Sequence, residues 1–263
     1  MQVNEFSYGP VTPALGFAMS FVGAFLGLRC ATRARANDGW ARRRWLVLAG
    51  VSLGLSCVWV GHFVEMLGFA VPGGTVRYDV PETLASAMLA VAAMCAGLFI
   101  SGRGRRVGRL LLGGLLAGLG IASMHYIGMA AMRMPGAVSY NPSWLLVSTA
   151  VAVAGGIAVT WSALRPHGIR ATVGASLIIA VAVGGTHYAG MAAMRMSAQP
   201  MAMAVRGATA LGFLLPLILV ITILTYIVTF IIAIAPSEEE VREDATLQVR
   251  IAELNRRLSD RAR

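Results

Sequence analysis

A chain of 263 residues that is 57% hydrophobic and only 13% charged cannot be an ordinary soluble domain, because soluble domains carry roughly 25% charged residues. Its net charge of +10 comes from 22 basic residues, all of them arginine. These arginines stand in short loops between apolar runs. Arginines in such places determine the topology of a membrane protein and do not form a nucleic-acid-binding surface, so a nucleic-acid partner is excluded.

Seven apolar segments are long enough to span a lipid bilayer, which needs about 20 residues. In chain order they cover residues 10–29, 45–69, 83–100, 110–133, 143–164, 171–195 and 209–235. The predicted fold class is therefore all-α, a polytopic membrane protein with seven transmembrane helices. We assign residues 8–235 to this membrane domain and residues 236–263 to a tail or linker.

The arginines alternate between the two sides of the predicted bundle. Twelve stand in or beside the loops after the first, third and fifth segments, and four stand in the opposite loops, namely Arg77, Arg133, Arg195 and Arg206. Short loops rich in arginine stay on the cytoplasmic side of a membrane. We therefore predict an N-terminus outside the cell and a cytoplasmic C-terminus.

Three copies of one motif fall on the even-numbered segments. The stretch Met124–Met134 is repeated almost unchanged as Thr186–Met196, and a more divergent copy covers Gly61–Phe69. Their histidines stand 63 and 62 residues apart, and in each copy a methionine follows four positions later. A fixed period of this kind indicates an internal repeat, and the repeat unit here is a pair of helices.

We predict that His62, His125 and His187 meet near one axis. The three helix pairs have the same orientation, and such parallel repeats are related by an axis along the membrane normal. The predicted architecture is three parallel two-helix repeats, then a seventh helix and a cytoplasmic helical tail. Polar groups at membrane depth are costly and usually face the bundle interior in functional roles.

Each copy places an imidazole and a thioether on one helical stripe, because residues i and i+4 share a face. We expect Met132 and Met194 to extend this stripe to i+7. Imidazole suits copper, zinc, iron and nickel, and the added thioethers favour copper, especially Cu(I), over the alternative, zinc. Packing alone is the other reading, since methionine fills gaps and Gly and Ala let helices approach closely.

Glu65 occupies the place that Gly128 and Gly190 hold in the other two copies. We expect its carboxylate near the outer interface, pointing to water. The alternative roles are a partner for an imidazole or a proton acceptor. We interpret the remaining candidates as structural: packing or interface aromatics (Trp59, Tyr126, Tyr188), a solvated loop residue (His167) and small buried thiols (Cys30, Cys57, Cys95).

The tail changes character after residue 236. Leu247, Ile251, Leu254 and Leu258 follow a 4-3-4 spacing over about two heptads, fewer than a convincing coiled coil shows. A homodimer seam and a plain amphipathic helix both fit this pattern. The tail is therefore a candidate contact for a second copy of the chain or for a cytoplasmic signalling partner.

The hexapeptides Met124–Met129 and Thr186–Met191 resemble the MHYT domain family, a bacterial integral-membrane module. The resemblance covers about residues 8–235 and implies a seven-helix sensor in the bacterial inner membrane. It implies copper near the outer face, through which O2, CO or NO is sensed. In that family the domain is often fused to cyclic-di-GMP synthase and phosphodiesterase domains, to histidine kinases or to DNA-binding domains. We see no such output domain in this chain and expect no enzymatic activity.

The resemblance also assigns the metal ligands position by position. The candidate ligands are His62, His125, His187, Met66, Met129 and Met191. The possible auxiliary residues are Met124, Met132, Met194 and Glu65. Gly61 and Thr186 stand where the second copy has Met124, so the first motif position is not the same residue in all three copies.

The sequence thus predicts a copper-binding membrane sensor that detects a diatomic gas or redox state and signals to the cytoplasm. One alternative is a copper transport or delivery protein. The inner halves of the even-numbered segments are almost wholly apolar, which favours a dead-end site over a transport path. The second alternative is a zinc-dependent membrane hydrolase, for which Glu65 would be the available general base.

Overall fold

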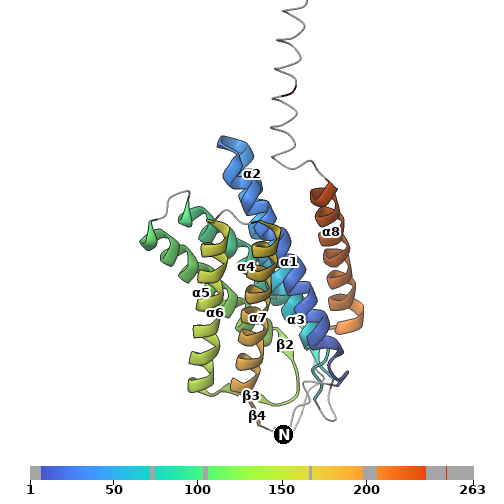
Figure 1. The fold of residues 1–263 in the computed structure, drawn as a ribbon. Coiled ribbons are helices and arrows are strands. Elements are labelled where there is room, and N and C mark those ends of the chain that lie inside the picture. The colour runs from blue at the N-terminus through green and yellow to red at the C-terminus, as the bar shows by residue number, and fades with distance from the viewer. Residues whose placement is uncertain are drawn as a thin grey trace, which may run out of the picture. The chain divides into compact units, whose positions relative to one another are not determined.

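The computed structural model describes residues 7–71, 75–102, 106–165, 168–197, 206–234 and 247, and it consists mainly of long helices (Figure 1). Within these residues, seven helical segments are long and apolar enough to cross a membrane. They cover Val11–Ala36, Gly39–Met66, Val80–Ser101, Val107–Ala130, Pro142–Ala163, Ile169–Ala193 and Ala210–Ile232. The predicted helical, multi-pass membrane fold is confirmed.

Five of these spans each consist of one regular α-helix, and two include a π-helical stretch. The regular ones are α1 (Val11–Ala36), α4 (Val80–Ser101), α5 (Val107–Ala130), α6 (Pro142–Ala163) and α7 (Ile169–Ala193). The second span joins α2 (Gly39–Val51), the π-helix η1 (Ser52–Val60) and α3 (Gly61–Met66). The seventh joins the π-helix η2 (Ala210–Leu214) to α8 (Leu215–Ile234).

The first connection is much shorter than the loop predicted for residues 30–44. Helix α1 continues to Ala36 and α2 begins at Gly39. The apolar run ends near Arg29, but alanine and arginine are good helix formers and carry the helix onward. Hydropathy had located the edge of the lipid-facing part of α1, not the end of the helix.

The first six spans form a closed ring. Each span packs against the next along the chain, and α1 also packs against α7, so the ring closes without α8. The spans that carry the histidines also touch one another, since α7 contacts both α3 and α5. This arrangement is the one expected for three helix pairs around an axis.

One backbone hydrogen bond recurs in all three pairs. The N–H group of Ser7, just before α1, donates to the carbonyl of Gly68 at 3.0 Å. Asp79 before α4 donates to Ala131 at 2.8 Å, and Asn141 before α6 donates to Ala193 at 2.7 Å. Each acceptor stands six residues after the histidine of its own pair. The repeat seen in the sequence is therefore also a repeat of the structure.

Short strands join the outer ends of the pairs. Strand β1 (Arg77–Tyr78) pairs antiparallel with β2 (Met132–Arg133) and with β5 (Ala208–Thr209). Strand β3 (Ala137–Tyr140) pairs antiparallel with β4 (Met194–Ser197). The sequence analysis did not predict these strands, whose residues it divided between helix ends and outer loops.

Two methionine assignments are wrong for this reason. Helix α5 ends at Ala130 and α7 at Ala193, so Met132 lies in β2 and Met194 in β4. Neither can extend a helical stripe to i+7. The chain leaves the helix here because it must turn into the outer strands, whose backbone groups pair with the strand that precedes the first helix of the same pair.

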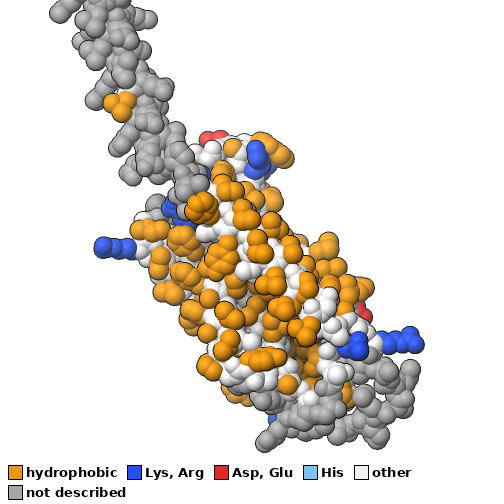
Figure 2. All heavy atoms as spheres, turned by 90° about the vertical axis from the view of Figure 1, so that its right-hand side faces the viewer, with side chains coloured by type: hydrophobic (Ala, Val, Ile, Leu, Met, Phe, Trp, Pro, Cys, Tyr) orange, Lys and Arg blue, Asp and Glu red, His pale blue; other side chains and the backbone are white. Residues whose placement is uncertain are grey.

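Large hydrophobic side chains cover the lateral surface of the spans. Figure 2 shows one such face, with hydrophobic side chains across its middle and charged ones near its margins. Examples are Met88, Leu146 and Ile178, which are 73%, 70% and 63% exposed. An apolar surface of this extent suits contact with lipid.

The chain divides into two units, Met1–Thr225 and Tyr226–Arg263. In the second unit the structure describes the end of α8 and Leu247. Two predictions lie outside the described residues: the tail seam at Ile251, Leu254 and Leu258, and the loop position of His167.

Candidate metal centre

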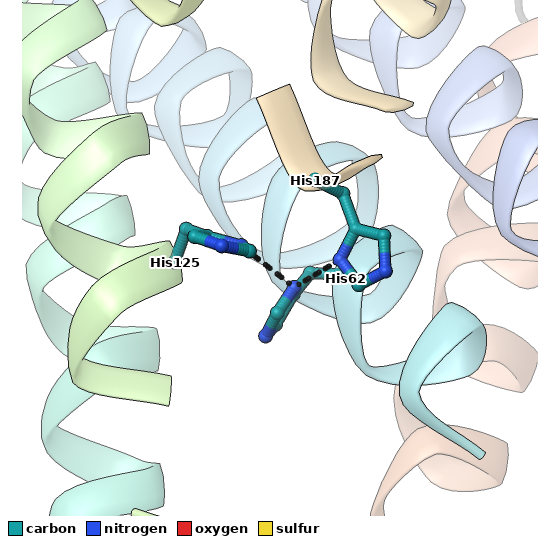
Figure 3. A group of neighbouring side chains, drawn as sticks. All are labelled: His62, His125 and His187. Carbon is teal, nitrogen blue, oxygen red and sulfur yellow. Dashed lines mark hydrogen bonds between the residues drawn. The ribbon is translucent and has the colours of Figure 1, made fainter. Parts of the chain in front are cut away.

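Three histidines from three different spans meet inside the ring. His62 lies on α3, His125 on α5 and His187 on α7, each within the last two turns of its span. Their side chains are 1%, 1% and 4% exposed. Figure 3 shows the three rings turned toward one another, as the parallel-repeat arrangement predicts.

Two of the three pairs of Nδ1 atoms lie at about the separation of ligands that share one ion. The Nδ1 atom of His62 is hydrogen-bonded to that of His187 at 2.9 Å and to that of His125 at 3.3 Å. One donor nitrogen from each histidine lies within 4.8 Å of the others. Metal–nitrogen bonds of about 2.0 Å on a tetrahedral ion place the nitrogens about 3.3 Å apart. The cluster therefore fits a mononuclear site with only small adjustments.

Aromatic side chains pack around the histidine cluster. Phe63 stacks edge-on against His62, with ring centroids 4.8 Å apart. Trp59 lies 4.7 Å from the Phe63 ring, is fully buried, and donates its indole N–H to the Ser86 hydroxyl at 3.0 Å. Tyr126 hydrogen-bonds to Ser148 through its hydroxyl. Trp59 is thus a packing residue of the interior, which agrees with the structural interpretation of the aromatics.

Glycines make room for two of the three imidazoles. A Cβ atom on Gly128 would lie 3.0 Å from Nε2 of His62, and one on Gly190 would lie 2.7 Å from Cδ2 of His125. The first distance is a tight contact and the second is an overlap. Gly128 and Gly190 each stand three residues after the histidine of their own copy, and position 65 is the equivalent position in the first copy. We call these three positions the seats, because an imidazole of another repeat packs on each glycine.

Glu65 does not point to water, as the sequence analysis had expected. Its side chain is buried, and its Oε2 atom lies 3.5 Å from Nδ1 of His187. It fits there because Gly184 on α7 faces Oε1 and Gly16 on α1 faces the Cγ and Cδ atoms. The expectation was wrong because it rested only on how near Glu65 lies to the outer end of its span. In the fold, glycines on two neighbouring helices leave room in the interior for the carboxylate.

The motif methionines are buried, but they divide into two groups. Met66, Met129, Met191 and Met124 lie on helices and are at most 3% exposed. Met132 and Met194, on strands, are 5% and 9% exposed. In α5 and α7 the spacing keeps Met129 and Met191 on the face of the histidine in the same helix.

The cysteines lie outside this cluster. Cys30 and Cys57 are fully buried and Cys95 is half-buried, and all three are free thiols. The expectation of small buried side chains holds for the first two. Among the described residues, the histidines form the one cluster of three or more His, Cys, Asp or Glu side chains with metal-site spacing.

The sequence analysis missed the π-helix η1 and its link to α8. The hydroxyls of Ser56 on η1 and Thr225 on α8 are hydrogen-bonded at 2.6 Å. Two serines four residues apart, Ser52 and Ser56, in an otherwise apolar run were the available signal. π-Helical segments are frequent at functional sites, and this one ends just before His62.

A polar cluster forms the outer rim beyond the spans. Asp79 caps α4 by accepting the backbone N–H of Glu82 at 3.1 Å. The Arg133 guanidinium pairs with Asp79 at 3.1 Å and with Glu82 at 2.8 Å. The Glu82 amide and then Arg133 lower the pKa of the Asp79 carboxyl. Burial raises the pKa of the neighbouring Tyr78 phenol.

Comparison with known proteins identifies the repeat. Residues 56–114 and 118–176 each match the MHYT family, described as "Bacterial signalling protein N terminal repeat". The first stretch contains His62 and the second contains His125. No solved structure matches the chain.

Three bacterial signalling proteins are among the relatives. The bifunctional diguanylate cyclase/cyclic di-GMP phosphodiesterase MucR of Pseudomonas aeruginosa is 34% identical over 96% of this chain and 37% of its own length. The cyclic di-GMP phosphodiesterase NbdA of the same organism is 37% identical over 73% of this chain and 25% of its length. An uncharacterized signaling protein of Caulobacter vibrioides is 32% identical over 67% and 22%. The chain thus spans little more than a third of the longest-matched relative.

Proposed function

Because this chain belongs to the MHYT family of bacterial signalling proteins, we propose that it is a membrane sensor whose histidine centre binds copper. The observation that carries the proposal is the convergence of three buried imidazoles from three repeats, with Nδ1 atoms 2.9 and 3.3 Å apart. Burying three such polar rings together is costly unless their nitrogens find partners. Hydrogen bonds of His62 with His125 and with His187 meet part of this need, and a shared metal ion would meet it for all three Nδ1 atoms at once.

The choice of copper rests on the donor set. Imidazole accepts copper, zinc, iron and nickel, and thioether sulfur favours Cu(I). Met129 and Met191 follow their histidines by four residues, which places them about 6 Å nearer the outer end at 1.5 Å per residue. Copper then enters from the outer side, passes the thioethers and stays at the imidazoles.

The signal is a diatomic gas that binds the copper or a change in its oxidation state. Either event alters the preferred geometry of the three histidines and hence the packing of the spans that carry them. For this to act as a switch, the altered centre must favour one of two packings. The arginine distribution orients the protein in the bacterial inner membrane with its N-terminus outside, so the response passes to the cytoplasm.

In this proposal helix α8 carries the response. The Ser56–Thr225 hydrogen bond ties η1, which leads directly into the helix of His62, to the span that continues to Ile234. By analogy with the cyclic di-GMP enzymes among its relatives, the module would regulate cyclic di-GMP turnover through an attached or partner enzyme.

The test is the metal content of the purified full chain. Cells receive copper, zinc and iron, and the bound metals are measured by mass spectrometry for the wild type and for the triple variant His62→Ala/His125→Ala/His187→Ala. We expect copper in the wild type and its loss in the triple variant. His167→Ala, which removes the fourth histidine of the sequence, is the matched control and should keep the metal.

Three results would decide against the proposal. A metal-free wild type would remove the site, and a triple variant that binds as the wild type does would make the imidazoles structural. Zinc in place of copper, with no response to reductant, would favour the hydrolytic chemistry of a zinc-bound water over a redox or gas sensor.

A further inference from the structure

The three repeats pack in a cyclic order around the histidine cluster. His62 of the first repeat lies against the seat Gly128 of the second, and His125 of the second lies against the seat Gly190 of the third. The same order assigns His187 of the third repeat to position 65 of the first. The structure places Glu65 there, 3.5 Å from Nδ1 of His187.

The seat at position 65 thus holds a carboxylate where the other two hold a hydrogen atom. Glu65 is 5% exposed and its Oε2 atom has no hydrogen-bond partner among the described residues. Its one described ion-pair partner is His187. A buried carboxylate without partners is expensive, and such groups are normally paired with a charge or bound to a metal. The cluster of imidazoles beside it provides the place for such a metal.

We infer that Glu65 is the fourth donor of the metal centre, so the centre is a three-histidine, one-carboxylate site. This inference rests on the proposed function. The distance of 3.5 Å between Glu65 Oε2 and His187 Nδ1 is close to the roughly 3.3–3.5 Å between two ligand atoms on a tetrahedral ion. Both atoms can therefore bind one ion without a large movement of either helix.

The carboxylate changes which ion the centre prefers. Three neutral imidazoles and one carboxylate carry a net charge of −1, and carboxylate oxygen is a harder donor than nitrogen or sulfur. It stabilises a divalent ion, Cu(II) or Zn(II), more than Cu(I). Glu65 thus determines the specificity of the centre and stabilises the oxidised state of bound copper, while the methionines favour the reduced state.

The experiment compares the affinities of the full chain for Cu(I), Cu(II) and Zn(II) in the wild type, Glu65→Gln and Glu65→Gly. Glu65→Gln keeps the volume and a hydrogen-bond acceptor but removes the charge. Glu65→Gly restores the seat of the other two repeats. Glu82→Gln, at a carboxylate that pairs with Arg133 on the outer rim, away from the histidines, is the control.

We expect both Glu65 variants to lose Cu(II) and Zn(II) affinity by at least about tenfold, the scale seen when a single metal-site partner is removed. Their Cu(I) affinity should stay within about threefold of the wild type, since a soft ion gains little from a carboxylate. The electron paramagnetic resonance spectrum of bound Cu(II) should change in both variants. Glu82→Gln should match the wild type in every measurement.

Two results would overturn the inference while leaving the proposed function in place. One is unchanged Cu(II) and Zn(II) binding in both variants. The other is an equal loss of all three ions in Glu65→Gly with none in Glu65→Gln, which would mean that Glu65 only holds His187 in position. A wild type that binds no metal would overturn both proposals.

Discussion

The first repeat and the other two solve the same packing problem differently. The second and third copies carry glycine at the seat and reach their histidine along an ordinary α-helix. The first copy carries Glu65 at the seat and reaches His62 through the π-helix η1. The three histidines nevertheless meet. The repeats thus keep the positions of their histidines even though the first copy differs from the others in the charge at its seat and in its backbone conformation.

The difference follows from what each seat must accommodate. Gly128 and Gly190 face imidazole atoms so closely that a methyl group would overlap or compress them. At position 65 the neighbouring helices leave room for a side chain, because Gly16 and Gly184, which lie against Glu65, have none of their own. A side chain is excluded at Gly190 and crowded at Gly128, whereas position 65 accommodates one, so the one carboxylate of the site can be there.

The strongest test of this difference between the repeats is to replace a seat glycine with alanine. Gly190→Ala should destabilise the protein by about 1–3 kcal/mol, the usual cost of overpacking, and should weaken metal binding. Gly128→Ala should have a smaller effect, since its contact is looser. Both are measured by thermal unfolding in detergent and by metal content.

The control for the seats is Gly174→Ala on α7, where a Cβ atom would meet nothing within 4 Å. Alanine should be neutral there or stabilise the helix by up to about 1 kcal/mol. Equal effects at Gly190 and Gly174 would show that the seats are not needed.

Substitutions of the motif methionines test whether their thioether sulfurs act as copper ligands. Met129→Leu or Met191→Leu should lower Cu(I) affinity several-fold and leave Cu(II) affinity nearly unchanged, because leucine keeps the volume but lacks the sulfur. The control is Met94→Leu, which replaces an equally buried methionine on α4. A Cu(I) affinity that is the same in all three variants would assign the motif methionines to packing.

The hydrogen bond between Ser56 of the first repeat and Thr225 of α8 should contribute less to stability than the seat glycines. Removing one hydrogen bond between membrane helices costs about 0.6 kcal/mol on average. Thr225→Val should therefore leave metal affinity unchanged and reduce the effect of metal on hydrogen exchange in α8. If metal protects α8 equally in the variant and the wild type, the signal does not pass through Ser56 and Thr225.

The smallest effect is expected at the outer rim, where Asp79 and Arg133 join the two outer ends of the second helix pair. The pKa of Asp79 is lowered in the folded protein from its ordinary 3.8, so its contribution is present above that value and is lost as the pH falls through the folded pKa. The group is exposed, and salt should screen part of the effect. Asp79→Asn should flatten the acid limb of the stability curve, and an unchanged limb would show that Asp79 plays no part.

The sequence predicted the spans and the meeting of the histidines because both follow from strong periodic signals. Hydropathy located the lipid-crossing segments, and the repeat period placed His62, His125 and His187 at equivalent points. The same signals gave no information on the short strands, so Met132 and Met194 were assigned to the wrong element. The burial of Glu65 depends on Gly16 and Gly184, which are remote from it in the chain and could not be connected to it without the fold.

The central claim is that one ion is shared by His62, His125 and His187. The extended X-ray absorption fine structure of copper bound to the full chain tests it most directly, because imidazole rings give a recognisable scattering pattern there. We predict three imidazole nitrogens at about 2.0 Å in the wild type and two in His125→Ala reloaded with copper. A spectrum dominated by sulfur, or one that does not change in the variant, would contradict the account.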